Sequence, residues 1–300
     1  MLSVRNLHGF AIVGAAIGLS DAEELHLRRQ GIGRRESMRH RPGAVGLVTG
    51  GGSGIGAAAA MRLAAAGCDI AINYSRNAQG AEEVAHRCRD LGVRAMTLMG
   101  DVAQDADCRR MAEAVADTFG RLDILVNSAG VTRRVPSNDL EALSGADFHT
   151  VDAVNVVGTF QMIRAAVPYL RRSDMAAIIN ISSESGLSGD GSSLAYAASK
   201  GALNTLTIGL ARELAPAIRV NAICPGFVDT SWALAWQDEE SYARFREQVI
   251  AIAPLKTIPS PSDIADAVEW LALGGRAVTG QLIVIDAGTH LTAGNPLLAP

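Results

Sequence analysis

The sequence contains few cysteines and histidines, and neither type forms a recognisable cluster. Four cysteines, Cys68, Cys88, Cys108 and Cys224, occur in 300 residues without a C-x-x-C pair. Isolated cysteines of this kind are typical of reduced thiols, so we expect no disulfide framework and a cytoplasmic protein. The six histidines are dispersed without metal-ligand spacing, so we expect no metal site.

An excess of positive charge and a long apolar run are also missing. The formal net charge is −4, which provides no basic surface for nucleic acid. No apolar run reaches the roughly 18 to 20 residues that span a bilayer, so we expect no membrane partner. Hydrophobic residues make up 48% of the chain and charged residues 19%, which is enough to bury a large core.

Residues 1–42 differ in charge from the rest of the chain. They hold seven arginines and four acidic residues, a net charge of +3, whereas the remainder carries −7. The apolar run from Phe10 to Leu19 leaves a signal peptide open. We favour a poorly ordered extension, or an upstream start with translation beginning at Met38. The folded domain is therefore expected over residues 43–300.

A glycine cluster lies between a predicted buried strand, residues 45–49, and an alanine-rich predicted helix, residues 57–66. Residues 49–56 read Thr-Gly-Gly-Gly-Ser-Gly-Ile-Gly. Backbone N–H groups and the helix dipole at such a position can receive a pyrophosphate. The glycines at which a side chain would block this approach are Gly50, Gly54 and Gly56. The alternative is a flexible turn.

The next predicted strand, residues 69–74, continues into Asn73-Tyr74-Ser75-Arg76. In dinucleotide-binding folds an acid at this strand end holds the ribose 2′-hydroxyl and favours NAD. Asp69 lies at the opposite end of the strand, whereas Arg76 could meet a 2′-phosphate. We therefore predict NADP(H) as the preferred cofactor, with NAD(H) possible; the alternative is that Arg76 only points into solvent.

Two later strand ends carry further candidate ligand residues. Asp101 and Val102 follow a predicted strand, residues 93–99, at the place where adenine lies in such folds, although Asp101 could instead cap a helix. The predicted strand over residues 122–126 leads into Asn127-Ser-Ala-Gly130, whose small residues allow close approach of a ligand.

Tyr196-Ala-Ala-Ser-Lys200 provides a candidate acid/base pair. On a helix the two side chains lie one turn apart on the same face, and an ammonium beside a phenol lowers the phenol pKa. Ser183 follows a predicted strand, residues 177–181, and its hydroxyl could converge with Tyr196 on one carbonyl oxygen. Asn155 lies in a long predicted helix, residues 148–170, where it could simply face solvent.

Residues 44–287 resemble the short-chain dehydrogenase/reductase family. The matching features are Thr49-Gly-x-x-x-Gly-x-Gly56, Asn127-Ser-Ala-Gly130, Asn155, Ser183, Tyr196-x-x-x-Lys200 and Pro225-Gly226 with Thr230. Within the family the sequence is most similar to 3-oxoacyl-carrier-protein reductases and to sugar or polyol dehydrogenases. The resemblance implies a single doubly wound Rossmann-type α/β domain with about seven parallel strands, acting on a small carbonyl or alcohol substrate.

The resemblance also implies a role for each matched residue. Tyr196 would exchange a proton with the substrate oxygen, and Ser183 would hydrogen-bond that oxygen. Lys200 would lower the pKa of Tyr196 and hold the nicotinamide ribose, and Asn155 would hold a water that leads to Lys200. Cofactor contacts are expected at Gly50, Ser53, Gly54, Ile55, Gly56, Tyr74, Ser75, Arg76, Asp101, Val102, Asn127, Ala129, Gly130, Tyr196, Lys200, Pro225, Gly226, Val228 and Thr230. Substrate contacts are expected at Ser183, Glu184, Tyr196 and Phe227, with Leu187 beside them.

Residues 227–258 are expected to form a flexible substrate lid, whose aromatic and apolar residues are Trp232, Leu234, Trp236, Tyr242 and Phe245. A helix capped by Ser262 and running to Leu273 should follow, and then a last strand, residues 281–285. Two positions depart from the family: Ser128 replaces its usual asparagine, and Ala287 its frequent glycine. The family also implies a homotetramer or homodimer.

Two functions of other classes remain as alternatives. A catalytically silent nucleotide-binding regulator would keep the fold, and a glycine-loop methyltransferase would have no use for Tyr196 and Lys200.

Overall fold

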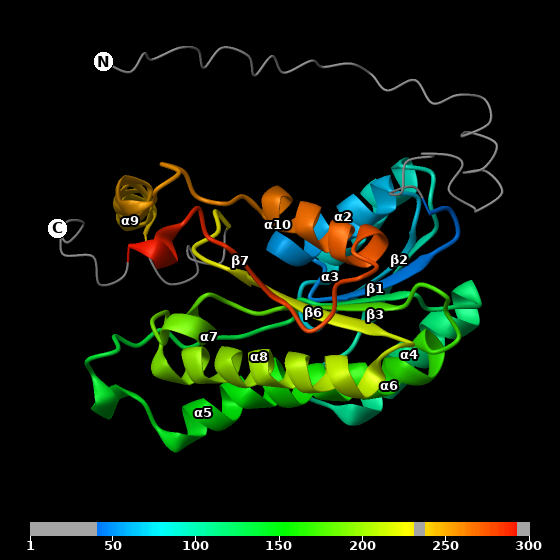
Figure 1. The fold of residues 1–300 in the computed structure, drawn as a ribbon, viewed down its shortest axis with the longest axis horizontal. Coiled ribbons are helices and arrows are strands. Elements are labelled where there is room, and N and C mark those ends of the chain that lie inside the picture. Colours follow the sequence, from blue (N-terminus) through cyan, green and yellow to red (C-terminus); the bar gives the residue numbers. More distant parts are fainter. Residues whose placement is uncertain (1–40, 231–237, 293–300) are drawn as a thin grey trace, which may run out of the picture. The chain divides into compact units, whose positions relative to one another are not determined.

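The protein is described by a computed structural model in which residues 41–230 and 238–292 are placed (Figure 1). These residues contain one seven-stranded parallel sheet in the order β3-β2-β1-β4-β5-β6-β7. The strands are β1 (Val45–Thr49), β2 (Asp69–Tyr74), β3 (Ala95–Met99), β4 (Ile124–Asn127), β5 (Ala177–Ile181), β6 (Arg219–Pro225) and β7 (Leu282–Ile285). The prediction of a doubly wound Rossmann-type sheet is confirmed.

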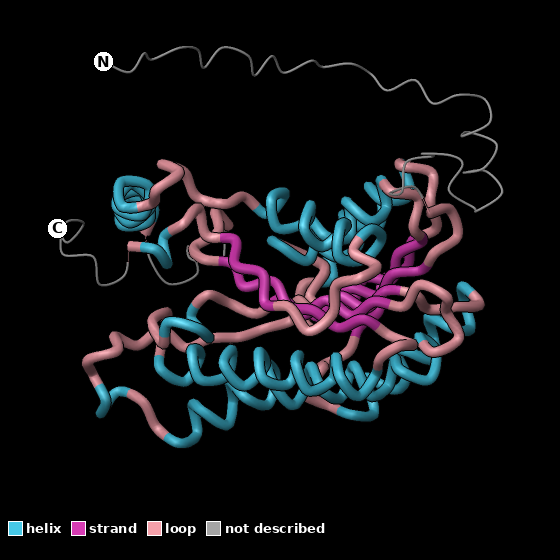
Figure 2. Tube along the Cα trace, viewed as in Figure 1, coloured by secondary structure: helices cyan, strands magenta, loops and turns pink. Residues whose placement is uncertain are grey.

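Helices cover both faces of this sheet (Figures 1 and 2). On one face lie α2 (Gly54–Ala65), α3 (Ala78–Asp90) and α10 (Pro261–Glu269). On the other lie α4 (Asp105–Phe119), α5 (Gly145–Asp152), α6 (Thr159–Leu170), α7 (Ser185–Ser188) and α8 (Leu194–Leu214). Because side chains alternate along a strand, Leu47 of β1 packs into the α4/α6/α8 core and Val48 into the α2/α3/α10 core.

The strand order reverses between β1 and β4. The chain runs outward through β2 and β3 and then returns to place β4 on the other side of β1. In open parallel sheets ligands bind outside the carboxyl ends of the strands at such a switch point. The fold therefore places the candidate site above the ends of β1 and β4.

The long helix predicted over residues 148–170 is wrong in one respect. The structure has α5, then a π-helical turn from Ala153 to Gly158, then α6. Gly158 lies against Val102, whose Cγ2 would be 2.8 Å from an added Cβ. π-Helical turns are frequent at functional sites, and this one contains Asn155.

The helix before β7 also begins earlier than predicted. Ser260, not Ser262, is its N-cap, and Ser260 and Asp263 form a reciprocal capping box. Pro261 explains the difference, because proline is favoured at the first helical position, immediately after the cap. The α-helix ends at Glu269 and continues as a π-helical turn, Trp270–Gly274, instead of running unchanged to Leu273.

The expected flexible lid contains a helix in its described part, α9 (Glu239–Ile252). Trp232, Leu234 and Trp236 lie outside the described residues, as do residues 1–40 of the expected extension. Ala287, which replaces a frequent family glycine, has a φ of 56°. This left-handed conformation favours glycine, so the family preference has a conformational reason.

Residues 41–230 and 238–292 contain neither a membrane-crossing helix nor a cluster of metal ligands. None of the helices there combines the length and apolarity that a membrane crossing requires. Within the same ranges, no group of three or more histidine, cysteine or acidic side chains is placed to hold a metal ion.

Candidate functional site

A cavity of about 990 Å³ lies at the carboxyl ends of the strands, where the strand order reverses. It extends from the glycine loop and the β2 end to Ser183 and Tyr196. The predicted residues that line it are Gly50, Ser53, Gly54, Ile55, Ser75, Arg76, Asp101, Val102, Ala129, Gly130, Ser183, Glu184, Tyr196, Lys200, Pro225, Gly226, Phe227, Val228 and Thr230. Most of the predicted site is therefore brought together around one cavity.

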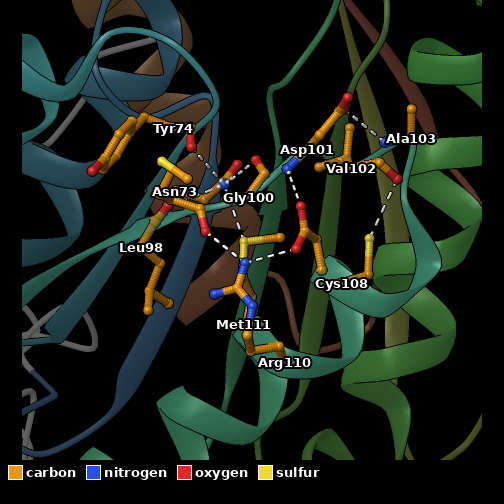
Figure 3. Close-up of polar contacts among 12 residues, drawn as sticks. Asn73, Tyr74, Leu98, Gly100, Asp101, Val102, Ala103, Cys108, Arg110 and Met111 are labelled. Atoms are coloured by element: carbon orange, nitrogen blue, oxygen red, sulfur yellow. Dashed lines mark hydrogen bonds and ion pairs between the residues drawn. The ribbon is translucent and has the colours of Figure 1, made fainter.

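Four predicted site residues do not line it: Gly56, Tyr74, Asn127 and Asn155. Tyr74 packs against the core on the α2/α3/α10 side, and Figure 3 shows its ring directed away from Gly100 and Asp101. Leu187 is also outside the lining and is half exposed, so its predicted pocket contact is wrong.

The glycine loop is fitted closely to its neighbours. Gly50 has a φ of 63°, and an added Cβ would lie 2.9 Å from Ala129 Cα. A Cβ on Gly56 would lie 2.4 Å from the Gly50 oxygen, so Gly56 permits the close packing of α2 on the loop. Gly54 is different: a Cβ there would meet only Thr230, at 3.7 Å. This space lies at the N-terminus of α2.

The first turn of α2 keeps its polar groups available. Ser53 is the N-cap, but its hydroxyl makes no capping hydrogen bond. The first N–H groups of a helix have no intrahelical acceptor, and together with the helix dipole they favour an anion. The loop geometry and the open space at Gly54 fit a pyrophosphate, as the sequence predicts.

The exposed Arg76 lies at the end of β2, on the cavity lining. It makes no ion pair with any residue that the structure describes. Asp69, at the other end of the same strand, is engaged by Arg94 at 2.7 Å. The charge that the end of β2 presents to the cavity is therefore positive.

Asp101 lines the cavity but does not cap the following helix. Its Oδ1 accepts a hydrogen bond from Ala103 N at 3.0 Å, and the N-cap of α4 is Gln104 (Figure 3). The capping alternative for Asp101 is therefore wrong. Its carboxylate closes a local turn beside the cavity.

Three side chains converge at the other end of the cavity. Tyr196 stands near the start of α8, where its backbone N donates to the N-cap oxygen of Ser193. Its hydroxyl hydrogen-bonds with Ser183, which follows β5. Lys200 lies one turn further along α8, with Nζ 5.5 Å from the centre of the Tyr196 ring and 2.9 Å from the Ile181 oxygen to which it donates.

Burial governs the protonation of this group. Tyr196 is 8% exposed and Lys200 4% exposed. Burial raises the pKa of Tyr196 to about 12, although its hydrogen bond with Ser183 works in the opposite direction. Burial lowers the pKa of Lys200 to about 8. The net pKa of Tyr196 is therefore raised, because the cost of burying a phenolate outweighs the stabilisation that its neighbours provide; a lowering contribution from Lys200 stays a prediction.

Asn155 supports the site from behind. Its side chain holds both backbone groups of Val131: Oδ1 accepts from Val131 N at 2.9 Å, and Nδ2 donates to Val131 O at 3.0 Å. Nδ2 also donates to Ser199 Oγ at 3.0 Å. Both amide hydrogens are thus used within the protein, so a water could be held only through its oxygens.

The Asn127 side chain lies on the face of the sheet that α8 covers, where Asn180 in turn contacts Thr207 of α8, and this explains why it does not line the cavity. Its Nδ2 donates to Asn180 Oδ1 at 2.9 Å. The loop after β4 is instead fixed by Thr49, whose Oγ1 accepts from Ser128 N at 3.0 Å and from Ala129 N at 3.1 Å. Thr49 is the first residue of the glycine motif, but the sequence alone does not predict that its hydroxyl holds the loop after β4.

An aromatic cluster forms part of the wall near Tyr196. Phe227 and Phe245 both line the cavity, in an edge-to-face contact with ring centres 5.0 Å apart. Tyr242 lies behind them, 5.9 Å from Phe227, and donates its hydroxyl to Asp229. The sequence predicts Phe245 as a lid residue but carries no signal that would place it on the cavity.

Several further lining residues were missed: Asn73, Thr132, Arg134, Ser185, Asp190 and Ser192. Only Asn73 carried a local signal, as a polar residue within an otherwise apolar strand. Ser185 begins α7, and the other four lie on two loops that meet through the 2.6 Å contact between the Thr132 and Ser192 hydroxyls, a pairing that chain order does not reveal.

Comparison with known proteins agrees with this geometry. A family model described as Enoyl-(Acyl carrier protein) reductase matches residues 50–290. The chain is 39% identical over 247 residues to a proposed ketoacyl reductase of the granaticin polyketide synthase of Streptomyces violaceoruber, covering 82% of this chain and 96% of the relative. It is 35% identical over 247 residues to the 3-oxoacyl-(acyl-carrier-protein) reductase FabG of Staphylococcus aureus, covering 82% and 97%.

A solved structure extends the comparison to three dimensions. A short-chain dehydrogenase from Burkholderia cenocepacia J2315, crystallised in complex with NADP, superimposes with a TM-score of 0.74 at 35% identity. The match covers 83% of this chain and 98% of that one.

Proposed function

The chain belongs to the short-chain dehydrogenase/reductase family of oxidoreductases, and from this premise we propose that it reduces a small ketone to a secondary alcohol with NADPH. The observation that carries the proposal is the meeting of the Ser183 and Tyr196 hydroxyls in the same cavity as the glycine loop. NADPH, when bound, supplies the hydride.

Ser183 and Tyr196 act on the substrate oxygen. Tyr196 is protonated at neutral pH, because burial raises its pKa to about 12, and it can donate that proton as the oxygen becomes an alkoxide. Ser183 donates a hydrogen bond to the same oxygen and stabilises its developing charge. Lys200 holds the nicotinamide ribose and, in its ammonium form, favours the tyrosinate left behind.

The cofactor is held along the opposite part of the cavity. The N-terminus of α2 with Ser53 and Gly54 receives the pyrophosphate, and Asp101 and Val102 border the adenine. Arg76 pairs with the 2′-phosphate, which gives the preference for NADP(H) over NAD(H). The uncompensated charge of Arg76 supports this preference, and so does the NADP complex of a similar structure.

The substrate is a 3-oxoacyl compound or a similar small ketone. The aromatic wall of Phe227 and Phe245 offers an apolar surface beside Ser183, and two relatives are named as reductases of oxoacyl or ketoacyl groups. A sugar or polyol substrate is the alternative within the family. Glu184, which also lines this end, could bind hydroxyl groups and is the observation that favours it.

The protein acts in the cytoplasm as a homotetramer or homodimer. Exposed apolar residues on α5, on α6 and the turn between them, and on α8 support an assembly through these helices: Phe148, Val157, Phe160 and Ile208. Light scattering after size-exclusion chromatography measures the assembly, and a monomer at micromolar concentration contradicts it.

The function is tested by NADPH and NADH oxidation at 340 nm over a carbonyl panel of acetoacetyl thioesters, ketoses and small diketones. Activity with one class, abolished by Tyr196→Phe, is expected. If NADP binds but no carbonyl of the panel is reduced, either the panel lacks the substrate or the protein is a silent nucleotide-binding regulator. If NADP does not bind, the proposed function is wrong.

A further inference from the structure

One buried residue, Asn73, connects three segments at the nucleotide end of the cavity: the glycine loop, the end of β2 and the loop after β3. Asn73, at the end of β2, accepts a hydrogen bond at Oδ1 from Gly50 N at 3.3 Å. Its Nδ2 donates to Gly100 O at 2.9 Å, and Figure 3 draws these two residues side by side. Its backbone oxygen accepts from Gly51 N at 3.0 Å. Asn73, at the end of β2, therefore holds both the glycine loop and the loop after β3.

The amide of Asn73 is surrounded by acceptors. Besides Gly100 O, Nδ2 lies 3.0 Å from Met111 Sδ, 3.2 Å from Leu98 O and 3.3 Å from Tyr74 O. The two amide hydrogens face these four acceptors. A half-turn of the amide would bring Oδ1, which cannot donate, against them and would lose the bonds. Asn73 is 2% exposed, so no bulk water replaces these bonds if the amide is removed.

These contacts are directed at the cavity. Asn73 itself lines it, between Gly50 on one side and Gly100 and Asp101 on the other. Gly50 has little room to shift, since an added Cβ would already lie 2.9 Å from Ala129 Cα. Holding Gly50 N and Gly100 O on one amide therefore fixes the separation between the loop that faces the pyrophosphate and the loop that borders the adenine.

We propose that Asn73 is the positioning residue for the adenosine half of the cofactor. Its amide sets the spacing of the glycine loop and residues 100–102, so that both reach the nucleotide together. This inference rests on the proposed function, because it assumes NADPH as the ligand. It assigns no role to Asn73 in the chemistry at Tyr196.

A second asparagine offers a matched control. Asn221 in β6 is 1% exposed and also clamps a loop: Nδ2 donates to Val278 O at 3.0 Å, and Oδ1 accepts from Gln281 N at 3.0 Å. It does not line the cavity. Asn73→Ala and Asn221→Ala thus remove similar buried bonds, but only one removes them beside the nucleotide.

The experiment measures binding of adenosine 2′,5′-bisphosphate by calorimetry, together with turnover of NADPH and of reduced nicotinamide mononucleotide, which lacks the adenosine half. For Asn73→Ala we expect at least tenfold weaker binding of the bisphosphate and a KM for NADPH raised by a similar factor. The kcat at saturating NADPH, and turnover of the mononucleotide, should stay within threefold of wild type. Asn221→Ala should lower the melting temperature without changing either affinity more than twofold.

Unchanged bisphosphate affinity in folded Asn73→Ala overturns the inference, and so does an equal loss with the mononucleotide. If Asn73→Ala does not fold, hydrogen exchange of wild type decides instead. The bisphosphate should then slow exchange in residues 50–56 and 100–104 at the same ligand concentration, and protection of one loop alone overturns the inference. Wild type that binds neither NADPH nor the bisphosphate indicates failure of the proposed function.

Discussion

The two ends of the cavity are built from different parts of the chain. At the nucleotide end, the groups that face a ligand are mainly backbone groups of loops, held by glycines and by the buried amide of Asn73. At the catalytic end they are the side chains of Ser183, Tyr196 and Lys200, fixed on a strand end and on α8. The basic residues of the two ends also differ, because Arg76 is exposed whereas Lys200 is 4% exposed.

This difference separates binding from chemistry. A site made of backbone groups spreads its affinity over many contacts, so that removal of one side chain weakens binding only in part. A buried hydroxyl that transfers a proton has no substitute, because water is excluded from its position. Substitutions at the catalytic end should therefore lower kcat, and those at the nucleotide end should change KM for the cofactor.

Tyr196→Phe should have the largest effect. It removes the proton donor while keeping the ring that fills the cavity wall, so we expect kcat to fall about 10³-fold or more, within the range of general acid catalysis. Fluorescence titration should find NADPH affinity within threefold of wild type. Tyr169→Phe on α6, outside the cavity lining, is the control. An equal loss of NADPH affinity and kcat would show that the two ends are not separate.

Arg76→Ala should affect the other end. Loss of a charge-assisted pair with the 2′-phosphate should lower kcat/KM for NADPH about 10- to 100-fold and leave kcat/KM for NADH nearly unchanged. The control is Arg87→Ala, an exposed arginine on α3 that does not line the cavity. A variant with the same preference for NADPH as wild type contradicts the assignment of Arg76.

At both ends, how well sequence predicts a residue depends on whether its contacts are local in the chain. Lining residues such as Gly50, Ser183 and Tyr196 follow from motifs whose spacing the fold requires, and β5 was predicted with its correct bounds. The inward direction of Asn127 was not predictable, because it depends on Asn180 in a neighbouring strand. The clamp made by Asn73 was missed for the same reason: its partners lie more than 20 residues away in the chain.

Protonation was the least predictable property. The Tyr-x-x-x-Lys spacing correctly places Lys200 beside Tyr196, but spacing says nothing of burial. Burial moves both pKa values towards the neutral forms, upward for the phenol and downward for the ammonium.

The pKa of Lys200 predicts a pH dependence of the catalytic end. Burial lowers it to about 8, so the side chain is an ammonium below that pH and neutral above it. If the ammonium is needed to stabilise the tyrosinate, kcat for reduction should be constant between pH 6 and 7 and fall about tenfold per unit well above pH 8. Lys200→Arg should shift this fall to higher pH, because arginine stays charged.

The affinity of adenosine 2′,5′-bisphosphate provides the internal comparison for that profile. It should not follow the Lys200 titration, since Lys200 lies at the nicotinamide end. A fall in bisphosphate affinity with the same midpoint would mean that the titrating group acts on the whole cavity.

Phe245→Ala should have the smallest effect, and it tests whether Phe245 belongs to the substrate-binding part of the catalytic end. Phe245 meets Phe227 edge to face at the cavity wall, and such a contact contributes about 0.5–1.5 kcal/mol. We expect kcat/KM for an acetoacetyl thioester to fall roughly three- to tenfold, mainly through KM, with NADPH affinity unchanged. Ile252→Ala is the matched control, since Ile252 lies on the same helix, is 43% exposed against 40% for Phe245, and does not line the cavity. If Phe245→Ala instead improves kcat/KM for a ketose, the aromatic wall excludes polar substrates, and the sugar alternative is rejected for a physical reason: polar hydroxyl groups would lose water there without gaining hydrogen bonds.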